Sequence, residues 1–233
     1  MPPATPAREP LPLPAGEVHV HWLCPSDCDD ALLRAYEPLL SADERERRDR
    51  YVFPEGRREQ LLARALLRTT LSRYAPVPAT AWRFGKNAHG RPHVVGPSYP
   101  GLRLRFNLTH THGLVALAVL RADGTASDAH SNTRPPLHAV GLDAEDLEHR
   151  RRILEVADRF FAPPEVAALR ALPAEPPTLQ RDRFFDYWTL KEAYIKARGL
   201  GLAIPLDQFW FDLPPPRLTC APALDDDGAR WFF

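Results

Sequence analysis

The segment from Gln180 to Arg198 constrains the fold most, because it is predicted to form one long amphipathic helix. Trp188, Tyr194 and Ile195 are too large and apolar for a helix that is surrounded by water, so one side must be buried. Gly199 follows directly and is suited to the left-handed conformation that ends many helices. We therefore expect a half-buried helix whose charged side chains line a cleft.

The other predicted elements are short and of both kinds, which favours an α+β fold. Strands are expected at Val18–Leu23, at Leu114–Leu120 and at Ala139–Asp143, the last two buried because their apolar runs are continuous. Helices are expected after Ser41 as N-cap through Tyr51 with Pro54 closing it, from about Gly56 to Tyr74, and up to Phe161. Short strands with proline punctuation fill the remainder.

Composition excludes several classes of function. The 233 residues carry 30 basic and 30 acidic side chains, so the formal net charge is zero, whereas nucleic-acid binding usually needs a net basic face. Three cysteines fit a reducing compartment better than a disulfide-linked secreted fold. The N-terminus lacks the features of a signal peptide, and no stretch approaches the roughly twenty apolar residues that span a bilayer. We expect a cytoplasmic protein with no nucleic-acid or membrane partner.

Two carboxylates follow the predicted strand near residue 140. Asp143 and Glu145 would point to the same face of a strand, where they repel each other unless a cation lies between them. Mg²⁺ prefers such hard oxygen ligands together with substrate phosphates. The alternative is a solvated strand end, in which the two carboxylates simply face water.

A second charged pair lies on the long helix. Glu192 and Lys196 are four residues apart and so share one helical face. A carboxylate for a metal and an ammonium for a phosphate could project together from it. An ordinary surface pair is the alternative, although the apolar neighbours argue for a cleft.

A third segment, 105–113, combines Asn107, Thr109, His110 and His112 with a glycine. Hydroxyl, imidazole and backbone groups in such a segment can hold phosphate oxygens. The His-x-His pair could instead bind a transition metal, but no cysteine or carboxylate lies at a matching short spacing. A further cluster, His19, His21, Cys24 and Cys28, lacks the tight spacing of structural zinc sites.

These three segments, in this order, resemble the phosphopantetheinyl transferase superfamily. The residues that carry the resemblance are Asn107–Thr111 (NLTHT), Val140–Glu145 (VGLDAE), Trp188–Ala197 (WTLKEAYIKA) and Gly90-Arg91-Pro92. The length is similar to the longer, surfactin-synthetase-activating type. That resemblance implies two similar α+β lobes in one chain, with the active site in the cleft between them.

The resemblance also implies the domain organisation. Residues 1–16, rich in proline and alanine, would be a disordered lead-in. Residues 17–136 would form the N-terminal lobe, with 121–136 as a loop or linker. Residues 137–233 would form the C-terminal lobe, which carries the metal site.

Roles for individual residues follow from the same resemblance. The metal ligands would be Asp143, Glu145 and Glu192. His110 and Lys196 would contact phosphates of coenzyme A, with Thr109 beside His110. Arg91 would lie near the 3′-phosphate end of the nucleotide. Basic residues of the first helices would also bind the 3′-phosphate, and of these Arg47 is preferred and Arg58 is another candidate. Glu165 matches an acidic position considered as a base in the family, and Glu192 or a water is an alternative.

The function that the resemblance implies is transfer of the phosphopantetheine arm of coenzyme A to a serine of an acyl or peptidyl carrier protein, releasing 3′,5′-ADP. Mg²⁺, or Mn²⁺ in its place, would assist, and the chain is expected to be a monomer. The carrier is expected to present an acidic face, for which the basic run 149–152 is a candidate landing patch. Two alternatives remain: a Mg²⁺-dependent nucleotide or coenzyme A phosphohydrolase, and a non-catalytic module that binds coenzyme A or a carrier.

Overall fold

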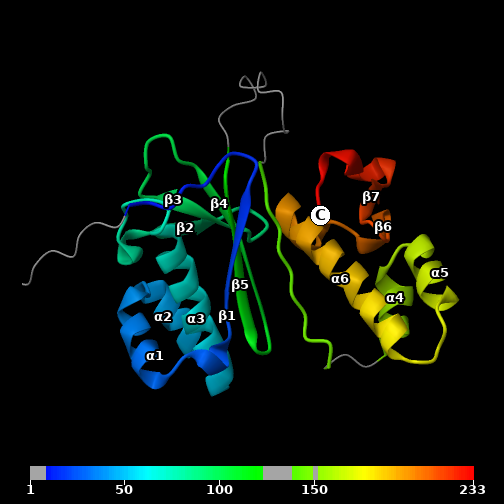
Figure 1. Ribbon diagram of the computed structural model, residues 1–233, viewed down its shortest axis with the longest axis horizontal. Helices are drawn as coiled ribbons and strands as arrows, with labels where there is room; N and C mark the ends of the chain where they lie inside the picture. The colour runs from blue at the N-terminus through cyan, green and yellow to red at the C-terminus, as the bar shows by residue number, and fades with distance from the viewer. Residues whose placement is uncertain (1–8, 123–137, 149–151) are drawn as a thin grey trace, which may run out of the picture.

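A computed structural model of the chain describes residues 9–122, 138–148 and 152–233. Figure 1 shows two lobes of mixed α and β structure side by side. The extended segment 138–146 runs between the sheet of the first lobe and the long helix of the second. The architecture is therefore an α+β fold in two lobes.

The N-terminal lobe packs helices against one face of an antiparallel sheet. Its elements are β1 (Val18–Leu23), α1 (Asp30–Tyr36), α2 (Ala42–Asp49), α3 (Pro54–Leu71), β2 (Arg83–Lys86), β3 (Pro92–Gly96), β4 (Leu104–Thr111) and β5 (Leu114–Arg121). The strand order in the main sheet is β1-β5-β4, and β2 and β3 form a separate hairpin. Strand β4 is thus an edge strand of the main sheet.

Strand β5 is buried on both faces, which explains its continuous apolar sequence. Val115, Leu117 and Val119 belong to the core clusters that α3 closes with residues such as Leu62 and Leu67. The alternate residues of β5, including Ala118 and Leu120, face the other way and pack against Val140 of the extended segment. A strand covered on both sides has no need of a polar face.

The C-terminal lobe is built on one long helix. Its elements are α4 (Ile153–Phe160), α5 (Pro163–Ala171), α6 (Thr178–Arg198), β6 (Phe209–Asp212) and β7 (Arg217–Cys220). Helix α6 buries Phe184 and Tyr194 in a cluster with Phe161, Phe209 and Phe211. Gly199 ends the helix with φ of 67°, the left-handed conformation that glycine adopts without a Cβ clash. Each lobe thus sets one long helix against an antiparallel sheet, with three strands in the first and two in the second.

Several predictions of local structure are confirmed. These are the strands at β1 and β5, the helix α6 with its Gly199 cap, and the helix α2 after Ser41. Ser41 and Glu44 form a reciprocal capping box, in which each side chain accepts a hydrogen bond from the other residue's backbone. Helix α3 begins at Pro54 and ends at Leu71, earlier at both ends than predicted. It can begin at Pro54 because proline is well tolerated in the first turn of a helix.

The predicted strand at Ala139–Asp143 is wrong: residues 138–146 are extended but belong to no sheet. Val140 is buried and Leu142 half-buried, but Leu142 N donates to the Asn107 side chain at 2.8 Å instead of to a neighbouring strand. The expected disorder of the lead-in is also wrong for residues 9–16. Leu13 is buried in the N-terminal core, and Leu11 N donates to Arg73 O at 2.6 Å.

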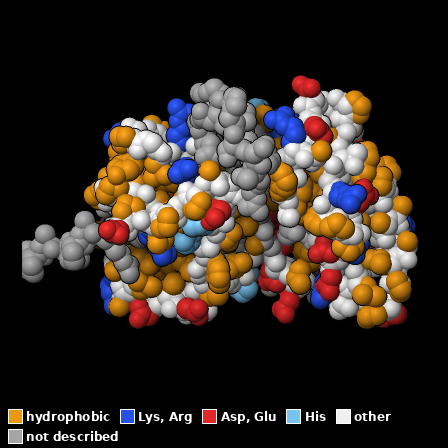
Figure 2. All heavy atoms as spheres, turned by 45° about the horizontal axis from the view of Figure 1, so that its top comes forward, with side chains coloured by type: hydrophobic (Ala, Val, Ile, Leu, Met, Phe, Trp, Pro, Cys, Tyr) orange, Lys and Arg blue, Asp and Glu red, His pale blue; other side chains and the backbone are white. Residues whose placement is uncertain are grey.

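Surface properties agree with the neutral composition. On the face visible in Figure 2, acidic and basic side chains are interspersed over both lobes without a continuous basic band. Within the described ranges, no helix is long and apolar enough to cross a membrane.

Candidate active site

Three separate segments of the chain meet at Asp143. Strand β4 contributes Thr109, the extended segment contributes Asp143, and helix α6 contributes Lys196. The Lys196 ammonium donates to Asp143 Oδ1 at 2.5 Å and to Thr109 Oγ1 at 3.2 Å. The Thr109 hydroxyl lies 3.3 Å from the same carboxylate oxygen. A cation, a hydroxyl and a carboxylate from both lobes therefore form one cluster, as the order of the sequence segments predicts.

The extended segment is held in place by side chains of β4. Asn107 Oδ1 accepts a hydrogen bond from Leu142 N at 2.8 Å, and Thr111 Oγ1 accepts one from Asp146 N at 3.0 Å. Gly141 lies against α6 so closely that an added Cβ would be 1.8 Å from the Ala193 carbonyl oxygen. Asp143 is thus fixed between two rigid elements, a strand and a helix.

The Asp143 carboxylate has one satisfied oxygen and one unsatisfied oxygen. Oδ1 accepts from Lys196, whereas Oδ2 is buried and has no hydrogen-bond partner among the described residues. A buried charged oxygen without a partner is costly, so this atom is suited to bind a cation. Glu145 Oε1, nearby on the same segment, accepts from Trp188 Nε1 of α6 at 2.8 Å.

The three expected metal ligands are not gathered into one set in this structure. Across the described ranges, no group of three or more His, Cys, Asp or Glu side chains is arranged to hold a metal ion. Glu192 is half-buried on α6, one turn before Lys196. Nevertheless, the chemistry of the donors fits Mg²⁺, because all three are carboxylates and one has an unsatisfied buried oxygen.

His110 lies on the opposite side of β4 from Thr109, as the alternation of a strand requires. Its imidazole is exposed, and Nδ1 lies 3.8 Å from Glu59 Oε2 of α3. The structure therefore does not bring His110 to the Asp143 cluster. It places the two neighbouring residues on either side of an edge strand.

The arginines with expected roles in coenzyme A binding occupy different environments. Arg47 is exposed on α2. Arg58 donates to the backbone carbonyls of Pro25, at 2.8 Å, and of Cys28, so its guanidinium anchors the loop before α1. Arg91 donates to the carbonyls of Ala197 and Val140. Arg47 is thus the exposed member of the three, whereas the guanidinium groups of Arg58 and Arg91 are engaged with backbone carbonyls.

Glu165 differs most from its expected role as a base. It lies buried in the first turn of α5 and forms an ion pair with Lys191 of α6 at 2.7 Å, with the two side chains 0% and 1% exposed. The backbone N–H groups of Ala162 and Phe211 also donate to it. Burial raises the pKa of Glu165, although Lys191 and these donors oppose the effect. A base must reach its substrate's proton, and this carboxylate faces the protein core.

Lys191 is a residue that sequence reasoning missed. Its ammonium also donates to the carbonyls of Leu206 at 2.8 Å and Phe209 at 2.6 Å, and burial lowers its pKa. The available signal was its spacing: Lys191 lies four residues after Tyr187 and three before Tyr194, and so shares the buried face of α6 with them. The two histidines of the His/Cys cluster near the N-terminus also have a structural partner. His19 Nδ1 and His21 Nε2 both form hydrogen bonds with the Tyr74 hydroxyl, at 2.8 and 2.7 Å.

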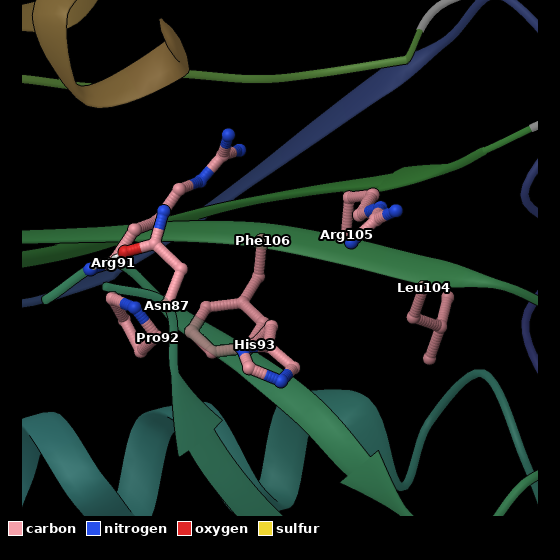
Figure 3. Close-up of a pocket in the computed structure, with 7 residues that line it drawn as sticks. All are labelled: Asn87, Arg91, Pro92, His93, Leu104, Arg105 and Phe106. Carbon is pink, nitrogen blue, oxygen red and sulfur yellow. Dashed lines mark hydrogen bonds between the residues drawn. The ribbon is translucent and has the colours of Figure 1, made fainter. Parts of the chain in front are cut away.

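A pocket of about 140 Å³ lies between the β2–β3 hairpin and β4. Figure 3 shows the residues that line it: Asn87, Arg91, Pro92, His93, Leu104, Arg105 and Phe106. The Arg91 side chain extends away from His93 and Phe106 in this view. The pocket combines an aromatic ring, an imidazole and cationic groups, a lining that suits a flat anionic fragment.

Most of the basic run 149–152, the expected landing patch for the carrier, lies outside the described residues, which omit 149–151.

Comparison with known proteins gives two family matches. A family model described as the 4′-phosphopantetheinyl transferase superfamily matches residues 139–232, and one described as 4′-phosphopantetheinyl transferase, N-terminal, matches residues 25–121. The two matches cover the two lobes separately.

Individual relatives span both lobes. The 4′-phosphopantetheinyl transferase HetI of Nostoc sp. is 36% identical over 217 residues, which cover 91% of this chain and 82% of the relative. The transferase gsp of Aneurinibacillus migulanus is 28% identical, covering 81% of this chain and 68% of its own. The transferase Sfp of Bacillus subtilis is 29% identical, covering 73% of this chain and 65% of its own.

Proposed function

This chain belongs to the 4′-phosphopantetheinyl transferase superfamily, and we propose that it transfers the phosphopantetheine arm of coenzyme A to a serine of an acyl or peptidyl carrier protein. The family uses coenzyme A as substrate and acts on carrier proteins. The observation that carries the proposal is the cluster of Thr109, Asp143 and Lys196, which joins both lobes at the residues that the family motifs supply.

We propose that Asp143, Glu145 and Glu192 hold a divalent cation, Mg²⁺ or Mn²⁺. The unsatisfied Oδ2 of Asp143 supports this assignment, since its partner oxygen already accepts from Lys196. When bound, the ion would supply positive charge to the pyrophosphate oxygens of coenzyme A. The Glu145 and Glu192 side chains would turn toward Asp143 to complete the ligand set.

In the proposed reaction, the carrier serine hydroxyl attacks the β-phosphorus of coenzyme A. A new bond forms between the serine oxygen and phosphorus, the phosphoanhydride bond breaks, and 3′,5′-ADP leaves with the bonding electrons. The Lys196 ammonium donates a charge-assisted hydrogen bond to a phosphate oxygen, and the Thr109 hydroxyl lies within reach of the same group. The serine proton passes to Glu192 or to a water. Glu165 takes no part, because it is paired in the core.

The placement of Thr109 and His110 sets how coenzyme A would bind. Because β4 is an edge strand, a flexible ligand can bend around it and contact residues on both faces. We propose that the pyrophosphate lies beside Thr109 and Lys196, and that a second phosphate reaches His110 and Arg47. The pocket beside the β2–β3 hairpin would then take part of the nucleotide. The carrier's acidic face, a monomeric enzyme and a cytoplasmic location are parts of the same proposal. So is the division between the two lobes at residue 136.

The test separates transfer from the two alternatives. Purified protein is incubated with coenzyme A, Mg²⁺ and an apo carrier, and released 3′,5′-ADP is measured by chromatography. A transferase releases the nucleotide only when the carrier is present, and it releases one 3′,5′-ADP for each carrier molecule that it modifies. Nucleotide release without carrier would indicate the phosphohydrolase. Tight coenzyme A binding with no release under either condition would indicate the non-catalytic module.

A further inference from the structure

The turn between β2 and β3 of the N-terminal lobe contacts the end of helix α6 in the C-terminal lobe. Asn87 organises this turn, because its side-chain oxygen accepts hydrogen bonds from His89 N at 3.0 Å and Arg91 N at 2.8 Å. Its side-chain nitrogen donates across to the Gly199 carbonyl at 2.7 Å. One asparagine thus shapes the turn and binds the other lobe.

Arg91 makes the second part of the contact. Its guanidinium donates to the Ala197 carbonyl of α6 at 2.6 Å and to the Val140 carbonyl of the extended segment at 3.3 Å. The side chain lies directly over Gly199, where an added Cβ would be 2.5 Å from Arg91 Cδ. Arg91 therefore touches all three parts that form the Asp143 cluster: the N-terminal lobe, the extended segment and α6.

The chemistry of a helix end explains why an arginine is suited to this place. The last four carbonyl groups of a helix have no partner within it, and the helix dipole makes this end negative. Arg91 and Asn87 satisfy two of the carbonyls at this end, and the positive guanidinium opposes the negative dipole. Both terminal nitrogens of the Arg91 guanidinium are thereby directed at backbone carbonyls and not at a ligand.

We propose that Arg91 and Asn87 form a clamp that fixes helix α6 against the N-terminal lobe and so positions Lys196 and Glu192 for the transfer reaction. The clamp binds Ala197, the residue next to Lys196, and Lys196 in turn contacts Thr109 of β4. Rotation of α6 by a small angle would move the ammonium away from Thr109 and Asp143. Arg91 is thus a positioning residue, in contrast to the expectation that it binds the 3′-phosphate.

The clamp and the phosphate ligand predict different results for Arg91→Ala. This inference rests on the proposed function, so turnover is measured with coenzyme A and an apo carrier, at a temperature where circular dichroism shows each variant folded. Displacement of a catalytic group by about 1 Å can lower the reaction rate by about 100-fold, so we expect kcat to fall roughly 10- to 100-fold. Arg91→Lys, which keeps the charge but lacks the planar, forked guanidinium, should recover part of this loss.

Binding distinguishes the two roles directly. The dissociation constants of coenzyme A and 3′-dephospho-coenzyme A are measured by calorimetry, and their ratio reports what the 3′-phosphate contributes. The clamp predicts the same ratio in wild type and Arg91→Ala. A ratio that falls toward one in the variant would show that Arg91 holds the phosphate, and would overturn the proposal.

A glycine pair supplies a matched control. Gly199→Ala would push a methyl group into Arg91, whereas Gly101 has a similar φ, 72° against 67°, with nothing within 4 Å of an added Cβ. Both alanines suffer the same backbone strain, so only Gly199→Ala should lower kcat. If both variants or neither lose activity, the clamp is contradicted. A wild type that modifies no carrier would contradict the proposed function instead, whereas equal kcat in wild type and Arg91→Ala would contradict the clamp alone.

Discussion

The buried pair of Glu165 and Lys191 allows a sharp prediction, because Glu165→Gln removes one charge and leaves the other in the core. The side chains are 0% and 1% exposed and 2.7 Å apart. An uncompensated buried charge costs about 3–5 kcal/mol, a large part of the total stability of about 5–15 kcal/mol that is usual for a protein. We expect Glu165→Gln to lower the free energy of unfolding by an amount in that range.

Urea unfolding followed by circular dichroism measures this loss, with an unchanged slope against urea indicating that the unfolded state is unaffected. Adding Lys191→Met should recover part of the lost stability, because it removes the unpaired charge. The recovery is only partial, because the carbonyls of Leu206 and Phe209 lose the hydrogen bonds that Lys191 donates. Glu46→Gln breaks the exposed pair with Arg50 and serves as the control with no measurable effect. A Glu165→Gln protein as stable as wild type would refute the reasoning.

The same variant tests the expected role of Glu165 as a base. Removing a general base typically costs about 100- to 10,000-fold in rate. The buried ion pair predicts that Glu165→Gln, assayed where it is folded, retains kcat within a few-fold of wild type. A stable variant with a loss of that size would restore Glu165 to the catalytic site.

Three further predictions concern other parts of the molecule. Burial alone would raise the pKa of Asp226, but the Tyr194 hydroxyl and Arg198 outweigh it and lower the pKa below its ordinary 3.8. The ionised Asp226 therefore stabilises the fold fully above that pH, and this contribution is lost as the pH falls through the lowered pKa. In Asp226→Asn, the free energy of unfolding should depend less on pH below about pH 4 than in wild type. Gly141→Ala would place a Cβ 1.8 Å from a backbone oxygen of α6 and should destabilise the protein by about 1–3 kcal/mol in urea unfolding, whereas no change would contradict the packing. Lys196→Ala should lower kcat by about 100-fold or more while the carrier KM stays near that of wild type, and an unchanged kcat would remove Lys196 from the site.

Elements governed by local sequence could be predicted. The α2 cap needs only Ser41 and Glu44, and the end of α6 needs only a glycine that tolerates positive φ. The family motifs also predict which segments converge, and Thr109, Asp143 and Lys196 do meet. Whether Glu145 and Glu192 join them around a metal remains a proposal.

Features that depend on distant partners could not be predicted. Glu44 alternates with arginines as a solvated residue would, yet it is buried and paired with Arg68 of α3 at 2.8 Å. The segment at Ala139–Asp143 has the apolar pattern of a buried strand, but its hydrogen bonds go to side chains of β4. Likewise, nothing near Arg91 in the sequence indicates that its guanidinium binds a helix end about one hundred residues away. In each case the partner is supplied by tertiary packing.

The most direct test of the central claim is the intact mass of an apo acyl or peptidyl carrier after incubation with this protein, coenzyme A and Mg²⁺. The account predicts that the carrier gains one phosphopantetheine group, and that the gain is lost with a chelator and with Glu192→Gln. Carriers of both kinds that keep their apo mass, with folded wild-type protein and coenzyme A bound, would contradict it.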